Sequence, residues 1–368
     1  MKKSSALMIG AVCLLLLLNG CAGYTEIENM DILTSHFVYR QGEQVQVGGG
    51  VANVRSFSDA MASEPVNFLS AEGENLHDAV SALQRSADHK LFYGGMRAIV
   101  IGNSYAEEGI GEFTRYIRGT PEQRMSVDVF TSENMPEEIV KYKAVNDFSG
   151  GFSAESIVRT LETEGLAVRC TLGDALAALA ERQVGFAVPN IAITDGIMKI
   201  DGYSVFDGER KAAFLDAEHI APLGFFLSPH AKGRYYADAG GRTVTIEAQM
   251  TDRELRVEEN TEGQLSVAAH FTFDLSVADI GSASVSAQET EAVIKQVTDQ
   301  IEASASELLE LAKSYGCDFL GLYKLYQTKH RAAFYNTDWR AKIKDMQYSV
   351  SVQAGTFEND LTNEELWR

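Results

Sequence analysis

The sequence is poor in cysteine and in positive charge, and it has no internal repeat. Its 368 residues include four cysteines and six prolines, and 32 lysines and arginines stand against 52 acidic residues, giving a formal net charge of −20. The lack of a repeat period excludes a collagen-like or solenoid chain. The deficit of basic residues excludes the surface that nucleic-acid binding requires, so we expect no nucleic-acid partner. It also excludes attachment to an anionic membrane by charge alone.

An amino-terminal secretion signal is predicted from residues 1–20. Lys2 and Lys3 precede an uncharged run of 13 residues, 6–18, which is shorter than a transmembrane helix requires. We therefore expect this segment to be removed. The alternative is an ordinary signal peptide with a chance cysteine at its end, or an uncleaved anchor.

The motif Leu18-Asn19-Gly20-Cys21 resembles the lipobox of bacterial lipoproteins. That motif places a small residue before an invariant cysteine, whose thiol receives a diacylglyceryl group before cleavage. An S-diacylglyceryl, N-acyl Cys21 would present acyl chains such as palmitate to the bilayer. Each buried CH₂ contributes about 0.8 kcal/mol, so two long chains anchor a protein stably where one chain is marginal. We predict that Cys21 attaches the chain to the lipid bilayer.

Two cysteines remain after Cys13 leaves with the signal and Cys21 is lipidated. Cys170 and Cys317 lie 147 positions apart and match no metal-binding or redox motif. The sequence does not decide whether they pair. Separate buried thiols are the expectation, because an unpaired cysteine behaves as a small apolar residue.

The segments after the signal predict a mixed α/β region up to residue 195. A hairpin is expected over 32–54, followed by a surface loop over 56–73. Strands and helices then alternate, which is typical of a mixed α/β unit. The expected helices are 74–87, a segment containing Ile110, Phe113 and Ile117, a helix beginning near Pro136, 154–164 and 172–182; the expected strands are 96–101, 126–131, 184–194 and 196–205, with 148–152 as a connection.

The pattern changes after residue 240. Strands are expected at 243–250, 254–259, 265–277 and 346–352, and a long helix at 286–315, where apolar residues recur every three or four positions. We expect an antiparallel sheet with the long helix packed on it. The predicted fold class is α+β or mixed α/β. The predicted regions are 21–195, holding domain I and part of a small second domain, a small middle segment at 196–240, and 241–368.

Three stretches, in this order, resemble the Ger(x)C family of lipoproteins, the C subunits of bacterial spore germinant receptors. The first, 76–129, contains the strand Ile99-Val100-Ile101-Gly102 between two helices. The second, 193–226, reads ITDGIMKIDGYSVFDGERKAAFLDAEHIAPLGFF and is similar to the family's hairpin and the segment after it. The third, 315–352, begins YGCDFLGL and continues into a basic helix and a V-x-V strand, with Phe334-Tyr335 near the family's proline and tryptophan.

The resemblance implies a three-domain α/β architecture and a non-enzymatic subunit of a nutrient germinant receptor acting in spore germination. It implies partners among the integral membrane A-type and B-type subunits of that receptor. It also implies a location on the outer face of the inner spore membrane, where Cys21 would hold the chain. No catalytic, cofactor-binding or metal-binding residues are implied.

Several motifs are better explained as structure than as sites. Gly48-Gly49-Gly50 is not followed by the Gly-Lys-Ser/Thr of a phosphate loop, so a bulge or a close backbone approach is expected. Ser153 lacks the second glycine of a nucleophile elbow and is expected to cap the following helix. The seven histidines, none at the spacing of a zinc site, are His36, His77, His89, His219, His230, His270 and His330.

Residues 324–344 reverse the charge of an otherwise acidic chain. Six basic residues stand there against Asp338 alone, and they are Lys324, Lys329, Arg331, Arg340, Lys342 and Lys344. One interpretation is a partner surface, carried by Arg331, Arg340 and Lys342, that meets an acidic loop or lipid headgroups. The other interpretation is an ordinary exposed helix.

Two other functions share secretion with this prediction. A solute-binding lipoprotein of an ABC importer would need two similar α/β lobes joined by a hinge, and the change near residue 240 does not fit that plan. A secreted hydrolase would need a nucleophile, a metal or a carboxylate pair, and no such group of residues is recognisable. The importer lipoprotein therefore remains the alternative to the receptor subunit.

Overall fold

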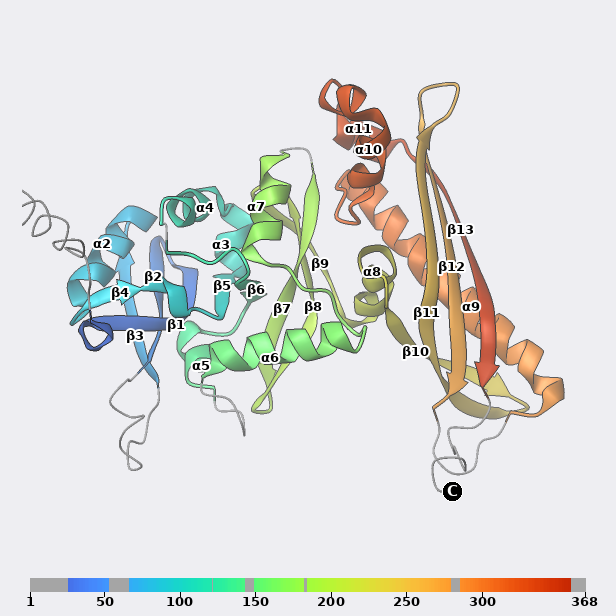
Figure 1. Ribbon diagram of the computed structural model, residues 1–368, viewed down its shortest axis with the longest axis horizontal. Helices are drawn as coiled ribbons and strands as arrows, with labels where there is room; N and C mark the ends of the chain where they lie inside the picture. The colour runs from blue at the N-terminus through green and yellow to red at the C-terminus, as the bar shows by residue number, and fades with distance from the viewer. Residues whose placement is uncertain are drawn as a thin grey trace, which may run out of the picture.

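The computed structural model describes residues 26–52, 66–120, 122–142, 149–181, 184–278 and 285–358. The predicted signal and Cys21 lie outside the described residues. Figure 1 shows a larger sheet with helices packed around it, and beside it a smaller sheet crossed by one long helix. The fold class is confirmed as a mixture of α-helices and β-sheets.

The larger sheet begins with the predicted hairpin. Strands β1 (Met30–Gln41) and β2 (Gln44–Ala52) pair antiparallel. Strand β3 (Val66–Gly73) then pairs antiparallel with β2, so the prediction of a surface loop over 56–73 is wrong for residues 66–73. Side chains on both faces of β3 are half-buried. Its sequence therefore lacks the alternation of apolar and polar residues that identifies a strand.

Parallel pairing extends the sheet from β1 through β5 (Ala98–Gly102) to β6 (Asp128–Ser132), and the short β4 (Lys90–Phe92) also pairs with β1. Parallel strands need crossover connections, which the helices supply. These helices are α2 (Leu76–Ser86), α3 (Asn103–Glu108), α4 (Gly111–Arg118), α5 (Pro136–Val140), α6 (Gly150–Thr163) and α7 (Leu172–Ala180), with short 3₁₀ turns at η1 (Ile27–Asn29) and η3 (Tyr93–Gly95).

Three further strands complete the larger sheet, in the order β3-β2-β1-β5-β6-β7-β8-β9. Strands β7 (Gly185–Thr194), β8 (Ile197–Asp207) and β9 (Arg210–Leu215) form an antiparallel meander. The larger sheet therefore continues to residue 215. The division of the chain near residues 195 and 240 stays a prediction, because strand pairing alone does not delimit domains.

The smaller sheet has the order β10-β11-β12-β13, made by β10 (Lys232–Ala239), β11 (Arg242–Glu259), β12 (Leu265–Val277) and β13 (Gln347–Glu358). Two details differ from expectation. The strands predicted at 243–250 and 254–259 are one strand, because a bulge between Met250 and Asp252 absorbs the irregularity. The last strand, β13, pairs parallel with β12 rather than antiparallel.

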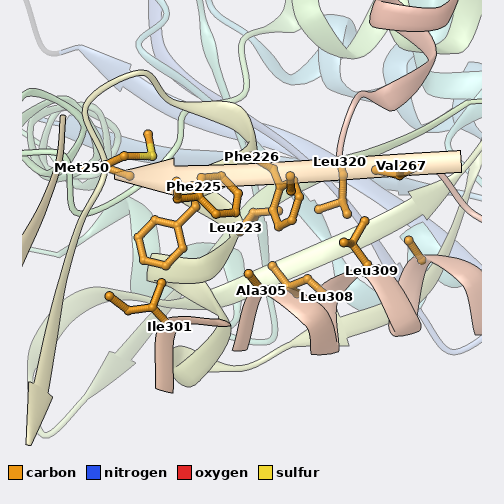
Figure 2. Close-up of a cluster of buried hydrophobic side chains, with 14 of the residues drawn as sticks. Leu223, Phe225, Phe226, Met250, Val267, Ile301, Ala305, Leu308, Leu309 and Leu320 are labelled. Atoms are coloured by element: carbon orange, nitrogen blue, oxygen red, sulfur yellow. The ribbon is translucent and has the colours of Figure 1, made fainter. Parts of the chain in front are cut away.

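The predicted long helix is α9 (Ala287–Tyr315). Ser286 and Glu289 form a capping box at its start, and Gly316, with φ 61°, ends it in the left-handed region. Figure 2 shows Ile301, Ala305, Leu308 and Leu309 of α9 facing aromatic residues of α8 (Ile220–Leu227). The remaining elements are η4 (Ala217–His219), α10 (Leu322–Tyr335) and α11 (Trp339–Lys344).

One apolar core joins the two sheets. Tyr203 and Val205 of β8 and Leu215 of β9 belong to the same buried cluster as Leu223 of α8 and Leu308 of α9. The backbone N–H of Lys232 also donates to the carbonyl of Gly165 across 2.7 Å. The smaller sheet is therefore fixed to the meander end of the larger one by buried apolar surface.

Candidate interaction surface

The basic segment is held in place by a buried carboxylate. Asp318, fully buried after the end of α9, accepts hydrogen bonds from the backbone N–H groups of Leu322 at 2.9 Å and Tyr323 at 2.7 Å. These are the first two residues of α10, whose N–H groups have no partner within the helix. Gly321, at φ 73°, turns the chain back so that the carboxylate reaches them. Asp318 thus takes the place of an N-cap side chain for α10.

Trp339 connects the same carboxylate to α11. Its indole N–H donates to Oδ2 of Asp318 across 3.0 Å, and its side chain is fully buried. Burial raises the pKa of Asp318, and the N–H donors around it oppose part of that rise. Sequence reasoning placed Phe334-Tyr335 near the family's tryptophan position and missed this pair. The signal that could have identified the pair is Asp318, an aspartate two residues after Gly316, where α9 ends.

The structure separates the three residues proposed for the partner surface. Arg340 forms an ion pair with Asp207 of β8 at 2.7 Å. Lys342 pairs with Glu259 of β11, and its Nζ donates to the carbonyl of Gly263 at 2.6 Å. Both side chains therefore tie α11 to neighbouring strands.

Arg331 differs from these two residues. It is exposed, it follows a kink in α10 at His330 (φ −130°, ψ 44°), and no ion pair is found for it among the described residues. Two other basic residues of the segment are also occupied, since Lys329 pairs with Glu258 at 3.2 Å and Lys324 lies over the ring of Tyr323. Arg331 is the side chain of the proposed set that stays open to a partner.

A shallow groove lies beside this segment, where α10 ends and α11 begins. Its volume is about 690 Å³, and Tyr335 and Lys344 are among the exposed residues that line it, together with Asn336, Thr337, Asp338, Arg340 and Ala341. The exposed fraction of Tyr335 is 56%, which is high for an aromatic residue. The groove joins the exposed ring of Tyr335 to Arg340, and tyrosine and arginine are both enriched at protein interfaces.

The motifs considered as sites have structural roles. An added Cβ at Gly49 would lie 1.9 Å from the carbonyl oxygen of Ser35, opposite a register shift in β1, so the predicted close approach is confirmed. The capping role predicted for Ser153 is wrong, because α6 begins at Gly150 with Ser149 as its N-cap. The hydroxyl of Ser153 instead donates to the carbonyl of Ser149 inside the helix.

The remaining cysteines and one histidine are buried. Cys170 and Cys317 are separate free thiols, as expected, and burial raises the pKa of each. His36 is fully buried, stacks on Phe113, and contacts the carbonyl of Gly48 through Nδ1 at 2.9 Å. Burial lowers the pKa of His36 to about 4. Its Nε2 has no hydrogen-bond partner among the described residues.

The described residues contain neither a metal-binding cluster nor a helix that could cross a membrane. No group of three or more histidine, cysteine or acidic side chains in this part of the chain is arranged to hold a metal ion. None of the helices described is both long enough and apolar enough to span a bilayer.

Comparison with known proteins identifies the family. A model described as spore germination protein N-terminal domain matches residues 23–193, and a second, described as spore germination B3/GerAC like, C-terminal, matches residues 201–355. The putative spore germination protein YfkR of Bacillus subtilis (strain 168) is 20% identical over 284 residues, which cover 73% of each chain. The crystal structure of the GerBC protein matches with a TM-score of 0.52 at 12% identity, over 87% of this chain and 96% of that one. The chain belongs to the Ger(x)C family of spore germination proteins.

Proposed function

We propose that this chain is the lipid-anchored, non-enzymatic C subunit of a spore nutrient germinant receptor. It acts beside integral A-type and B-type subunits, on the outer face of the inner spore membrane. The observation that supports this most directly is the lipobox-like motif ending at Cys21. Almost all of the chain after that cysteine matches spore germination family models. A body so rich in acidic residues needs such an anchor, because charge would repel it from anionic lipids.

The short distance along the chain from the anchor to the first described residue adds a constraint. Cys21 and Glu26 are five residues apart. A fully extended segment of that length spans less than about 20 Å. Acyl chains on Cys21 would therefore keep Glu26, four residues before β1, close to the bilayer surface and within reach of membrane-embedded subunits.

The alternative of an importer's solute-binding lipoprotein is not favoured. Such a protein closes two similar lobes around its solute by a hinge. Within the described residues, a mixed sheet of nine strands adjoins a sheet of four strands with a different topology, and one continuous apolar core joins the two sheets. That core leaves no hinge between two comparable lobes.

The test replaces Cys21 by alanine in the gene and scores spores for their nutrient response. We expect the Cys21→Ala protein to leave the membrane fraction and the response to fall as far as it does in a deletion strain. Mass spectrometry of the wild-type protein should find an acylated amino-terminal cysteine. A normal response in both the Cys21→Ala and the deletion strains would contradict the receptor role, and an unmodified or retained leader would contradict the anchor.

A further inference from the structure

The edges of the two sheets are protected unequally. An edge strand exposes unpaired N–H and C=O groups, and soluble proteins usually guard them with charged residues. Strand β9 carries Arg210 and Lys211, β10 carries Lys232, Arg234 and Asp238, and β3 carries Glu72. Strand β13 is longer than any of these, yet its 12 residues contain no charge before Glu358 at its end.

The outer edge of β13 also has no covering strand in the part of the chain that the structure describes. β13 lies at one margin of the smaller sheet, and no strand among the described residues pairs with its second edge (Figure 1). None of its 12 residues is buried. Tyr348, Val350 and Val352 pack against the apolar core that includes the buried side chains of α9. They are only half-buried, so part of their apolar surface stays exposed. An added strand would complete both the hydrogen-bonding ladder and this apolar layer.

We infer that β13 is a strand-addition site that receives an extended segment of a partner protein. The side chains of that segment would alternate between apolar residues, facing α9, and hydroxyl or amide residues on the other face. The hydroxyl or amide residues are required by the polar face of β13. On that face Ser351 is hydrogen-bonded to His270 at 2.9 Å, and Gln353 donates to Thr272 at 3.0 Å. Strand addition of this kind takes its affinity from main-chain hydrogen bonds and its specificity from alternate side chains.

Charge determines which partner fits. The hydroxyl of Tyr348 donates to the exposed Glu310 of α9 at 3.0 Å, whereas Asp299, three helical turns away on the same side of α9, is already paired with Lys295 at 2.6 Å. Glu358 is exposed at the far end of the strand. An antiparallel second copy would bring Glu358 of one chain toward Glu310 of the other, which repels. The partner segment therefore carries lysine or arginine near its ends and is not a second copy of this chain.

Strand addition at β13 goes beyond the proposed function, since it would hold for any protein partner. Its test uses the purified full-length chain in detergent, without other subunits. The probe is a labelled peptide of about ten residues with alternating valine and threonine and a lysine at each end. A second peptide has glutamate ends, and a third has two central prolines, which cannot donate to the ladder. We expect the lysine peptide to bind at least about tenfold more tightly than the glutamate peptide, and the proline peptide not to bind.

Hydrogen exchange identifies the strand that binds. The lysine peptide should protect the backbone amides of residues 347–358 and leave β10 unchanged. The double variant Ser349→Lys/Ser351→Lys should weaken binding at least about tenfold, whereas the matched control Thr243→Lys, on an interior strand of the same sheet, should not.

Three results would overturn the inference. They are equal binding of all three peptides, protection confined to another strand, and self-association of the unliganded chain that the double variant abolishes. The peptide series on the wild-type chain keeps the test decisive even if the double variant fails to fold.

Discussion

The indole N–H of Trp339 donates to the carboxylate of Asp318 across 3.0 Å, from a residue 21 positions further along the chain. The same carboxylate accepts the first two N–H groups of α10. One buried side chain is thus hydrogen-bonded to the first residues of both α10 and α11. Because the basic segment lies on these two helices, its placement depends on this contact.

Replacing Trp339 by phenylalanine should lower the free energy of unfolding by about 2–3 kcal/mol, since it removes a hydrogen bond to a charged group and leaves a cavity. Urea denaturation of the full-length chain measures the change. The control is Tyr335→Phe, on an exposed ring, which should alter stability by less than about 0.5 kcal/mol. Equal stability of the Trp339→Phe and wild-type proteins would show that the contact does not support the segment.

Much of the fold could be predicted because the responsible signals are local. The capping box of Ser286 and the left-handed Gly316 bound α9, and apolar spacing defines its buried face. Two glycines hide the start of α6 in the sequence. Gly150 and Gly151 read as a connection, but an added Cβ would lie 1.6 Å from the carbonyl oxygen of Ile139 at the first and 2.9 Å from that of Thr34 at the second. These glycines permit close helix packing rather than a turn.

The candidate surface was less predictable because its contacts join distant parts of the chain. Charge alone grouped Arg331, Arg340 and Lys342. The structure pairs Arg340 with Asp207, 133 positions earlier, and Lys342 with Glu259 on β11. No spacing rule relates residues so far apart, since packing of α11 against the two sheets brings them together. A count of basic residues therefore predicted the segment but not which of its side chains are free.

The junction of the two sheets depends on a glycine. A Cβ added at Gly185 would lie 2.3 Å from Sγ of Cys317 and 2.8 Å from the carbonyl oxygen of Phe206. We expect Gly185→Ala to lower the free energy of unfolding by about 1–3 kcal/mol through overpacking. Gly119→Ala is the matched control, because its nearest contact is 3.4 Å and its φ of −81° suits any residue. Thermal unfolding of both variants tests this, and an unchanged midpoint for Gly185→Ala would contradict the close approach.

The buried His36 should make the folded chain sensitive to mild acid. Its pKa falls from 6.5 to about 4 in the folded state, so the unfolded chain takes up the proton first as the pH drops. The stabilisation is complete above pH 6.5 and is lost as the pH falls from 6.5 toward 4. The loss is on the order of 3 kcal/mol, at about 1.4 kcal/mol per pKa unit.

Denaturation of wild type and His36→Asn at several pH values measures this slope. The His36→Asn chain, although less stable overall, should lack the part of the slope that His36 contributes. Parallel pH curves for wild type and His36→Asn would rule out the proposed titration.

Reversing single charges in the basic segment separates binding from folding. Arg331 is exposed and pairs with no acidic residue among those described, so Arg331→Glu should change the free energy of unfolding by less than about 0.5 kcal/mol. If the segment meets an acidic loop of a partner, the same change should lower recovery with co-expressed A-type and B-type subunits by about tenfold, because like charges then face each other. Arg340→Glu is less informative, since it places a glutamate against Asp207 and would lower recovery by disturbing the junction of the two sheets.

The matched control for Arg331→Glu is Lys199→Glu, an equal charge reversal at an exposed position on β8. Its recovery with the same subunits should stay at the wild-type level, because no partner surface is proposed there. Wild-type recovery of a folded Arg331→Glu chain would mean that the basic segment is an ordinary solvated helix. Contact with the receptor would then have to come from another part of the molecule, and the uncharged edge of β13 would be the next surface to test.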